Sequence, residues 1–311
     1  MKVVITGGCG FVGSKIAERL LSGGHEVLII ENFTTSVKND FKNCQVVKCD
    51  ITSPEELDAI KAKGFDALLH LAAQSSGPKS FDVPDIDIKI NILGTLNMIN
   101  WCAKNGIGRI LFASSFVVYG DNPSIEKFSE DMTCSPKSIY ALSKHTCEQL
   151  LRIYAEPRGI KWNALRMFNV YGPGQDLSRA DQGLVSIFLK LVKNNNYIGV
   201  KGSLDRFRDC VYIDDVVQGW ERCLLNSNFP NQVYNLGSGA KTYFSSLIDM
   251  LIEEYGKVGD VKVEEVEATP GDTVGCYADT TKISSQLGYK PQFNIRSGVK
   301  LFKKWVEENP V

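Results

Sequence analysis

The chain has 311 residues, of which 43% are hydrophobic, and its 35 Lys and Arg residues nearly balance its 36 Asp and Glu residues. This length and composition suffice for a substantial buried core in one large or two ordinary domains. The balanced charge, without a long basic run, argues against nucleic-acid binding, and no apolar run is long enough to suggest a membrane span.

The N-terminal residues pass directly into an apolar strand pattern without the features of a signal peptide, so the sequence predicts a cytoplasmic protein. Its nine cysteines are odd in number and scattered without a Cys-x-x-Cys pair, and there are only three histidines. These counts argue against a disulfide framework and against a zinc site.

The first strongly patterned segment is a predicted strand followed by a glycine-rich stretch, together residues 2–13. Apolar residues then recur at helical spacing, so the glycines lie between a strand and a helix. Gly8-x-Gly10-x-x-Gly13 and Gly7-x-x-Gly10-x-x-Gly13 both fit a loop that presents the N–H groups of a helix N-terminus to a pyrophosphate. A plain glycine-rich turn is the alternative interpretation.

A second predicted strand, residues 26–31, ends in Glu31. At this separation from a glycine loop, an acidic residue accepts hydrogen bonds from the hydroxyl groups of the adenosine ribose. Its negative charge repels the 2′-phosphate of NADP. The glycines and Glu31 together therefore predict an NAD site, although Glu31 alone could be an ordinary charged strand end.

Strand and helix patterns alternate through the first half of the chain, and one predicted helix opens with the capping box Ser53-Pro54-Glu55-Glu56. The alternation predicts an α/β protein with a doubly wound parallel sheet, a Rossmann domain over residues 1–167. Residues 168–311 are predicted to form a smaller α/β substrate domain, with residues of about 214–239 packing back on the first. The predicted strands of the first domain are residues 2–6, 26–31, 45–49, 66–72, 109–114 and 161–168.

Two further segments carry candidate reactive groups. Tyr140 and Lys144 lie one turn apart on one face of a predicted helix, where the ammonium group favours the phenolate form of the tyrosine. Ser114 and Ser115 lie at the C-terminal end of a predicted strand, the edge at which open α/β sheets bind ligands. Taken singly, the Tyr and Lys pair could be an ordinary surface pair, and either serine could simply complete a turn.

Taken together and in this order, these motifs resemble the extended short-chain dehydrogenase/reductase family, and more narrowly its nucleotide-sugar 4-epimerases. The resemblance runs nearly end to end. Its segments are TGGCGFVG at residues 6–13, Glu31-Asn32, CDI at 49–51, HLAAQ at 70–74, NILGT at 91–95, SSFVVYG at 114–120, YALSK at 140–144, RMFNVYGP at 166–173, RDCVYIDDV at 208–216, YNLGSG at 234–239 and PGD at 270–272.

The resemblance implies a role for each matching residue. Tyr140 would be the catalytic base, Lys144 its electrostatic partner and a ligand of the nicotinamide ribose, and Ser115 the hydroxyl that holds the substrate oxygen. The implied contacts of the cofactor NAD are Gly7, Gly10, Phe11, Val12, Gly13, Glu31, Asn32, Asp50, Ile51, Leu71, Ala72 and Ala73. Those of a nucleoside-diphosphate sugar, with a UDP-sugar favoured, are Gln74, Ser75, Asn169, Arg206 and Arg208. His70 is expected to be structural.

Three departures from the family pattern matter. Glu31 stands where Asp is more usual. Phe116 and Val117 occupy positions at which dehydratases of the family place an Asp and Glu pair and decarboxylases a Glu. Ala268-Thr269 stand where relatives often carry a second diphosphate-binding arginine, so the nucleotide would depend on other arginines, namely Arg206, Arg208 or Arg179.

The sequence therefore predicts a nucleoside-diphosphate-sugar 4-epimerase that oxidises C4 transiently with tightly bound NAD. The alternatives are a net 4-oxidase, a reductase or another epimerase on the same scaffold, and a non-catalytic protein that senses NAD. A homodimer is expected, because two helices resemble those of the family's four-helix dimer interface. They are the helix that continues from Tyr140 and the helix with Leu93, Leu96, Met98, Ile99 and Trp101.

Overall fold

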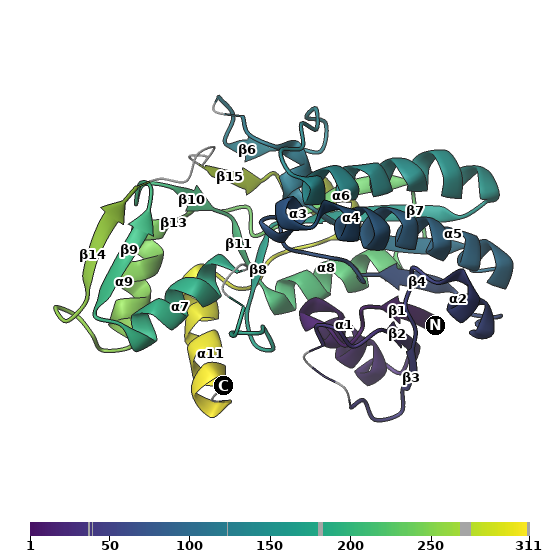
Figure 1. Cartoon of the computed structure of the whole chain (residues 1–311), viewed down its shortest axis with the longest axis horizontal. Helices are drawn as coiled ribbons and strands as arrows, with labels where there is room; N and C mark the ends of the chain where they lie inside the picture. The colour runs from purple at the N-terminus through teal and green to yellow at the C-terminus, as the bar shows by residue number, and fades with distance from the viewer. Residues whose placement is uncertain (37, 39, 123, 180–182, 268–274, 310–311) are drawn as a thin grey trace.

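A parallel sheet of seven strands forms the centre of the protein, in the order β12-β7-β5-β4-β1-β2-β3 (Figure 1). The order reverses between β1 and β4, and doubly wound folds bind ligands in the crevice at such a reversal. The predicted fold class is confirmed. The strands are β1 (Lys2–Thr6), β2 (Glu26–Glu31), β3 (Gln45–Lys48), β4 (Ala67–His70), β5 (Arg109–Ser115), β7 (Lys161–Met167) and β12 (Gln232–Leu236). The computed structural model describes residues 1–36, 38, 40–122, 124–179, 183–267 and 275–309.

Helices bury both faces of this sheet. Successive side chains of a strand point to opposite faces, so in β1 Val3 and Ile5 enter one hydrophobic core and Val4 enters the other. The first core includes side chains of α1 (Phe11–Ser22) and α8 (Ile213–Leu225). The second includes side chains of α5 (Gly94–Asn105) and α6 (Ile139–Leu150). Strands buried on both faces have nearly continuous apolar sequences. The six strands predicted from the sequence end within two residues of the observed bounds, whereas β12 was not predicted as a strand.

The short helix α2 (Pro54–Ala59) begins at the predicted place but with only half of the capping box. Ser53 Oγ accepts the main-chain N–H of Glu56 at 3.3 Å. The Glu56 carboxylate accepts the N–H of Asp50 at 2.9 Å, since the N–H of Ser53 already donates to the Asp50 carbonyl. In a full capping box the Glu56 carboxylate would accept the N–H of Ser53. Here it accepts the N–H of Asp50, which follows β3, instead.

The rest of the chain forms three small sheets beside the large one (Figure 1), ordered β13-β10-β15-β6, β11-β8 and β14-β9. Their strands are β6 (Lys127–Phe128), β8 (Asn169–Tyr171), β9 (Tyr197–Lys201), β10 (Phe207–Arg208), β11 (Cys210–Tyr212), β13 (Thr242–Tyr243), β14 (Lys262–Val266) and β15 (Gly275–Ala278). Their helices are α7 (Leu184–Asn194), α9 (Phe244–Glu254), α10 (Thr281–Leu287) and α11 (Ile295–Glu308). Although they come late in the sequence, α8 and β12 belong to the layers of the large sheet. A domain boundary at residue 167 stays a prediction.

Short helical segments fill the connections around the second face of the large sheet. They are α3 (Lys79–Asp82), α4 (Pro84–Asp87), the π-helical turn η1 (Ile88–Leu93), the 3-10 turn η2 (Phe116–Tyr119), and η3 (Leu151–Ala155) with η4 (Glu156–Arg158) after α6. Within the residues placed by the structure, no helix combines the length and the apolar character needed to cross a membrane.

Candidate active site

A cavity of about 570 Å³ opens where β1, β2, β4, β5 and β7 end. Most of the residues predicted from the sequence line it. They are Gly7, Gly10, Phe11, Val12, Gly13, Glu31, Asn32, Asp50, Ile51, Leu71, Ala72, Ala73, Ser75, Ser115, Tyr140, Lys144 and Asn169. Three predicted residues, Gln74, Arg206 and Arg208, are not among the residues that line it.

The glycines of the first loop have different tasks. Gly7, Gly10 and Gly13 line the cavity, whereas a Cβ on Gly8 would lie 2.8 Å from a side chain of β2. Gly7 has a φ of +69°, and a Cβ there would lie 2.7 Å from the main-chain nitrogen of Ala72. A Cβ on Gly13 would lie 2.1 Å from the Gly7 carbonyl oxygen, so only glycine lets the helix approach the strand this closely. The spacing that borders the cavity is thus the one that begins at residue 7.

The same loop provides the two features that a dinucleotide needs. Helix α1 starts after Gly10 without a side-chain cap, which leaves N–H groups of its first turn for an anion at the cavity. The Glu31 carboxylate is fixed beside the loop, because it accepts the N–H groups of Cys9 at 3.2 Å, Asn32 at 2.9 Å and Phe33 at 3.2 Å. An uncapped helix N-terminus for a pyrophosphate and a fixed carboxylate for a ribose fit NAD.

A buried histidine supports the turn that follows β4. Ala72, which lines the cavity, donates its N–H to Thr6 Oγ1 at 3.3 Å. The His70 ring lies between two threonines, with Nδ1 2.7 Å from Thr6 Oγ1 and Nε2 3.0 Å from Thr95 Oγ1. Burial lowers the pKa of His70 to about 3, and the positive charge of Lys144 acts in the same direction. A neutral His70 therefore holds this turn without taking part in proton transfer.

Three predicted reactive groups meet at one wall of the cavity. Helix α6 begins just before Tyr140, where Ser138 Oγ accepts a main-chain N–H of the first turn at 3.1 Å. One turn later, Lys144 Nζ donates to the Ala113 carbonyl of β5 at 2.9 Å and lies 5.8 Å from the centroid of the Tyr140 ring. Ser115 ends the same strand, and its hydroxyl group lies near enough to the Tyr140 phenol to lower the pKa of that phenol. Strand β5 and helix α6 thus place the phenol, the ammonium and the serine hydroxyl together.

The electrostatic surroundings oppose deprotonation of the phenol in the protein alone. Burial raises the pKa of Tyr140 to about 12, a shift that the hydrogen bond from Ser115 reduces and the charge of Asp87 increases. Burial lowers the pKa of Lys144 to about 8, against the opposite effect of Cys147, Asp87 and Glu148 around it. A base at position 140 therefore requires an additional positive charge at the cavity.

Gln74 is not among the residues that line the cavity, and its predicted contact with a sugar stays a prediction. Its side chain is buried, and Nε2 donates to the Asp87 carboxylate at 2.8 Å and to the Ser76 carbonyl at 2.9 Å. Asn91 donates to the same carboxylate at 3.1 Å and to Ser143 Oγ at 3.0 Å. This network joins η1 to α6, and the hydrogen bonds of Gln74 within it support the fold beside the cavity.

Arg206 and Arg208 also lie away from the cavity lining. Their guanidinium carbons lie 4.7 and 5.6 Å from the ring centroid of Phe244. Arg206 donates to the Lys201 and Ser203 carbonyls, and Arg208 to the carbonyl that precedes it, at 2.8 Å. Ala268 and Thr269, which stand where the resemblance implies a further arginine, lie outside the described part of the chain.

The structure adds cavity residues that the sequence analysis did not assign. Gln175 and Asp176 follow the Gly172-Pro173-Gly174 turn after β8, and they line the cavity together with Arg179. The buried Oε1 of Gln175 has no hydrogen-bond partner among the described residues. The signal for this segment was the turn itself, since loops after strand ends border ligand sites in such folds. Others without an assignment are Thr34, Thr35, Ser138, Met167, Phe168 and Val170.

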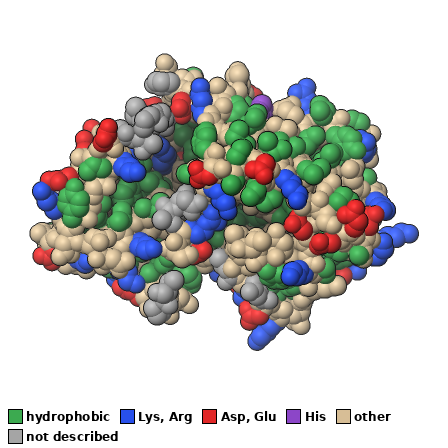
Figure 2. Space-filling model, viewed as in Figure 1, with side chains coloured by type: hydrophobic (Ala, Val, Ile, Leu, Met, Phe, Trp, Pro, Cys, Tyr) green, Lys and Arg blue, Asp and Glu red, His purple; other side chains and the backbone are tan. Residues whose placement is uncertain are grey.

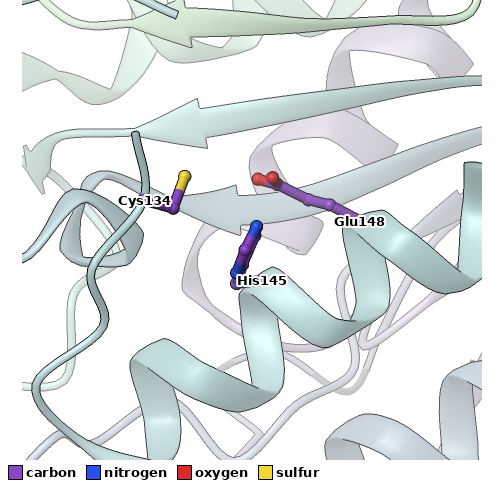
Figure 3. Close-up of side chains that lie close together, drawn as sticks. All are labelled: Cys134, His145 and Glu148. Atoms are coloured by element: carbon purple, nitrogen blue, oxygen red, sulfur yellow. The ribbon is translucent and has the colours of Figure 1, made fainter. Parts of the chain in front are cut away.

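A cluster with the composition of a metal site lies at helix α6, which carries His145 and Glu148 (Figure 3). Potential ligand atoms of Cys134, His145 and Glu148 lie within 4.8 Å of one another. The Glu148 carboxylate is already paired, because Arg166 donates to its two oxygens at 2.9 and 2.6 Å and Ser114 Oγ donates at 2.5 Å. A metal ion would have to displace the buried guanidinium group, so we assign this carboxylate to the ion pair.

The geometry of this site is that of a dinucleotide-dependent enzyme of the Rossmann type, and comparison with known proteins identifies its family. The profile of the NAD dependent epimerase/dehydratase family matches residues 3–237. The chain therefore belongs to the NAD dependent epimerase/dehydratase family, and its cofactor is NAD. The predicted family and cofactor are confirmed.

Relatives match over the whole length. A putative UDP-glucose 4-epimerase of Methanocaldococcus jannaschii is 34% identical over 310 residues, 99% of each chain. The crystal structure of UDP-glucose 4-epimerase from Thermotoga maritima with UDP-glucose has a TM-score of 0.93 at 30% identity, covering 99% of both chains. The Thermus thermophilus UDP-glucose 4-epimerase in complex with NAD has a TM-score of 0.89 at 30% identity, covering 100% of both.

Proposed function

We propose that the protein is a nucleoside-diphosphate-sugar 4-epimerase that acts by transient oxidation at C4. The observation that carries this proposal is the meeting of Tyr140, Lys144 and Ser115 at the wall of the cavity that the glycine loop also lines. Hydride transfer from a carbon that carries a hydroxyl group needs a base for the hydroxyl proton and a dinucleotide that accepts the hydride. This cavity combines a reactive phenol with a dinucleotide site.

In the proposed reaction, Ser115 holds the C4 oxygen of the sugar and Tyr140 takes the proton of its hydroxyl group. Lys144 and the serine hydroxyl stabilise the phenolate that makes this possible. NAD bound in this cavity would supply the acceptor and later the donor of the hydride, and the positive charge of its oxidised ring would favour the phenolate form of Tyr140. After the 4-keto sugar turns over, C4 would take the hydride back on its opposite face, which inverts C4, and Tyr140 would return the proton to the C4 oxygen.

The cofactor is restored in each cycle, so we propose that it stays bound between turnovers. Gly7, Gly10 and Gly13 would hold its pyrophosphate, and Glu31 its adenosine ribose. The adenine would lie near Asp50, and the remaining contacts would come from Phe11, Val12, Asn32, Ile51, Leu71, Ala72 and Ala73. Each of these residues lines the cavity.

The relatives named UDP-glucose 4-epimerases lead us to propose a UDP-sugar as the substrate. Of the polar groups that line the cavity, Asn169 and Arg179 are suited to its diphosphate, because an amide and a guanidinium group donate to phosphate oxygens. Ser75 is the proposed sugar contact in place of Gln74. Arg206 and Arg208 lie by Phe244, and substitution of Arg208 below tests its predicted role in substrate binding.

The deciding experiment is incubation of the purified protein with UDP-, GDP-, CDP- and dTDP-sugars, followed by NMR of the products. Inversion at C4 without net consumption of NAD is the expected result. A stable 4-keto product, or turnover that requires added NAD or NADH, would identify a net oxidase or reductase. Binding of NAD without any sugar turnover would identify a sensor. Substitution of Arg179 and of Arg208 by Ala then measures which arginine contributes to KM.

We further propose a homodimer that forms through the face made by α3, α4, η1, α5, α6 and η3. Large hydrophobic side chains are exposed on this face, and Figure 2 shows hydrophobic side chains gathered there. They are Phe81, Ile86, Ile88, Leu93, Leu142 and Ile153, with exposed fractions from 40% to 66%. Burial of such a set against a second copy removes apolar surface from water.

A further inference from the structure

The cavity wall next to the reactive serine is aromatic and apolar. Phe116 and Val117 follow Ser115 directly in η2, and both line the cavity. The Phe116 ring stacks on that of Phe168, with centroids 5.0 Å apart and planes 18° apart. Phe168 is 3% exposed and belongs to a buried cluster with Val118, Tyr119, Phe128, Cys276 and Ala278. The buried Phe168 therefore supports the Phe116 ring, so this ring cannot readily move away from a bound sugar.

We infer that this wall makes the enzyme selective for sugars with an uncharged C6 group over hexuronates. The inference rests on the proposed 4-epimerase activity and adds to it the class of sugar. The selecting residues are Phe116 and Val117, with Phe168 supporting the ring of the first.

The C6 group must come close to this wall because of the position of C4. The oxygen on C4 lies between Ser115 and Tyr140 in the proposed reaction, and C6 is only two bonds from C4. The sugar also turns over between the two hydride transfers, which exchanges the C5–C6 edge of the ring with the C2–C3 edge. If the C2–C3 edge faces Phe116 before the ring turns, the C5–C6 edge faces it afterwards, and the reverse order gives the same two poses. The C6 group therefore contacts the wall in one of the two poses.

A carboxylate at C6 would lose hydration against this wall without gaining a hydrogen bond from it. Neither a phenyl ring nor an isopropyl group donates a hydrogen bond, and burial of an unpaired charge is strongly unfavourable. Lys144 is the nearest cation along the wall, and its Nζ already donates to the Ala113 carbonyl. Arg179, the other cation of the described lining, shares its segment with Asp176. A hydroxymethyl group, in contrast, can pack its carbon on the wall and direct its oxygen elsewhere.

The test compares kcat/KM for UDP-glucose and UDP-galactose with kcat/KM for UDP-glucuronate and UDP-galacturonate, using NMR to follow inversion. We expect the neutral pair to be favoured by roughly 100-fold or more, given the cost of an unpaired buried charge. Val117→Thr adds a hydroxyl group at nearly constant volume, and Phe116→Ser adds one with more space. Each is expected to shift the ratio toward the uronates by about tenfold, since one hydrogen bond to a charged group contributes about 1.5 kcal/mol.

Val258→Thr is the matched control, because it makes the same chemical change at a side chain that is 72% exposed and does not line the cavity. Its ratio should equal that of the wild type. Uronates turned over as efficiently as neutral sugars by the wild type would overturn the inference and leave the 4-epimerase activity standing. The inference would also be overturned if Val117→Thr and Phe116→Ser both left the ratio of kcat/KM for neutral sugars to kcat/KM for uronates unchanged. If neither pair is turned over by NAD-loaded protein, the inference about the sugar fails, whereas the 4-epimerase activity itself fails only if no sugar of the nucleotide-sugar panel is inverted at C4.

Discussion

The ammonium group of Lys144 donates to the main-chain carbonyl of Ala113 at 2.9 Å. This bond joins α6 to the C-terminal end of β5, two residues before Ser115. Tyr140 lies one turn earlier on the same helix, so the contact joins the helix that carries the phenol to the strand that carries the serine hydroxyl. A single lysine therefore has two effects at this site, because it provides positive charge near the phenol and aligns the two elements that carry the reactive groups.

Tyr140→Phe is expected to keep the fold and the bound NAD but to lower kcat by roughly 10²- to 10⁴-fold, the usual contribution of a general base. The ring packing is retained and only the proton acceptor is removed. Stopped NMR assays with UDP-sugars measure the rate, and absorbance of the purified protein measures the cofactor. Tyr197→Phe, at an exposed position of β9, is the control. Turnover near the wild-type rate in the Tyr140 variant would remove the residue from its proposed role.

The cofactor site should bind NAD at least about fivefold more tightly than NADP, because like charges about 4 Å apart repel by about 1 kcal/mol even in water. The charge concerned is that of Glu31, whose carboxylate is held in place by the N–H groups of Cys9 and Asn32. Calorimetry on cofactor-free protein measures both affinities. Glu31→Gln retains the shape without the charge and should narrow the difference. Equal affinities in the wild type would contradict the prediction.

A site residue could be predicted from the sequence when a single strand end or helix turn sets the direction of its side chain. The glycine loop, Glu31 and the Tyr140 and Lys144 pair are local, because strand ends and helix turns fix their directions, and all line the cavity. Gln74 faces inward because its partner, Asp87, comes from a helix thirteen residues later, a contact with no local signal.

The same reasoning applies to the arginines. Arg206 and Arg208 are near each other in the sequence, yet both pack on Phe244, a residue of α9 that only tertiary folding brings there. Arg179 reaches the cavity from a loop with little regular structure. Periodicity predicts which face of an element is buried, but it does not predict which loop of one half of the chain covers a cavity in the other.

His70 should make the protein less stable in acid. Its pKa is lowered from 6.5 to about 3 in the folded protein, so between these values the unfolded chain binds one more proton. The free energy of unfolding therefore falls as the pH falls from about 6.5, by about 1.4 kcal/mol per pH unit from this residue. Urea unfolding at pH 7, 6 and 5 measures the slope. His70→Gln should lose stability at pH 7, with a weaker dependence on pH, and equal slopes for the two proteins would contradict this role.

The homodimer is tested on the exposed hydrophobic face. Leu142→Glu together with Ile153→Glu places two charges among side chains that are 47% and 66% exposed in the single chain. Light scattering at micromolar concentration should give a dimer for the wild type and a monomer for the variant, since buried unpaired charges at an interface are costly. Val258→Glu, on a surface loop, should stay dimeric. A wild-type monomer would count against the proposal.

The last prediction concerns elimination of water from the 4-keto sugar, which would give a 6-deoxy product. That reaction needs a base for the acidified C5 proton and an acid for the departing hydroxyl group, both held near the ring. At the positions where the resemblance places these groups in dehydratases, this chain has Phe116 and Val117, and both line the cavity. Neither side chain can accept or donate a proton.

We therefore expect the reaction in deuterated water to give a sugar inverted at C4, without deuterium at C5 and with its C6 oxygen retained. NMR of the product reads both features in one sample. Val117→Glu restores a carboxylate at one of the two positions and serves as the comparison, in which partial exchange at C5 is expected. Exchange at C5 or a 6-deoxy sugar from the wild type would show that another residue provides the acid and the base. The chain would then belong to the dehydratase branch of its family, because the chemistry at C5, and not the transient oxidation at C4, separates the two branches.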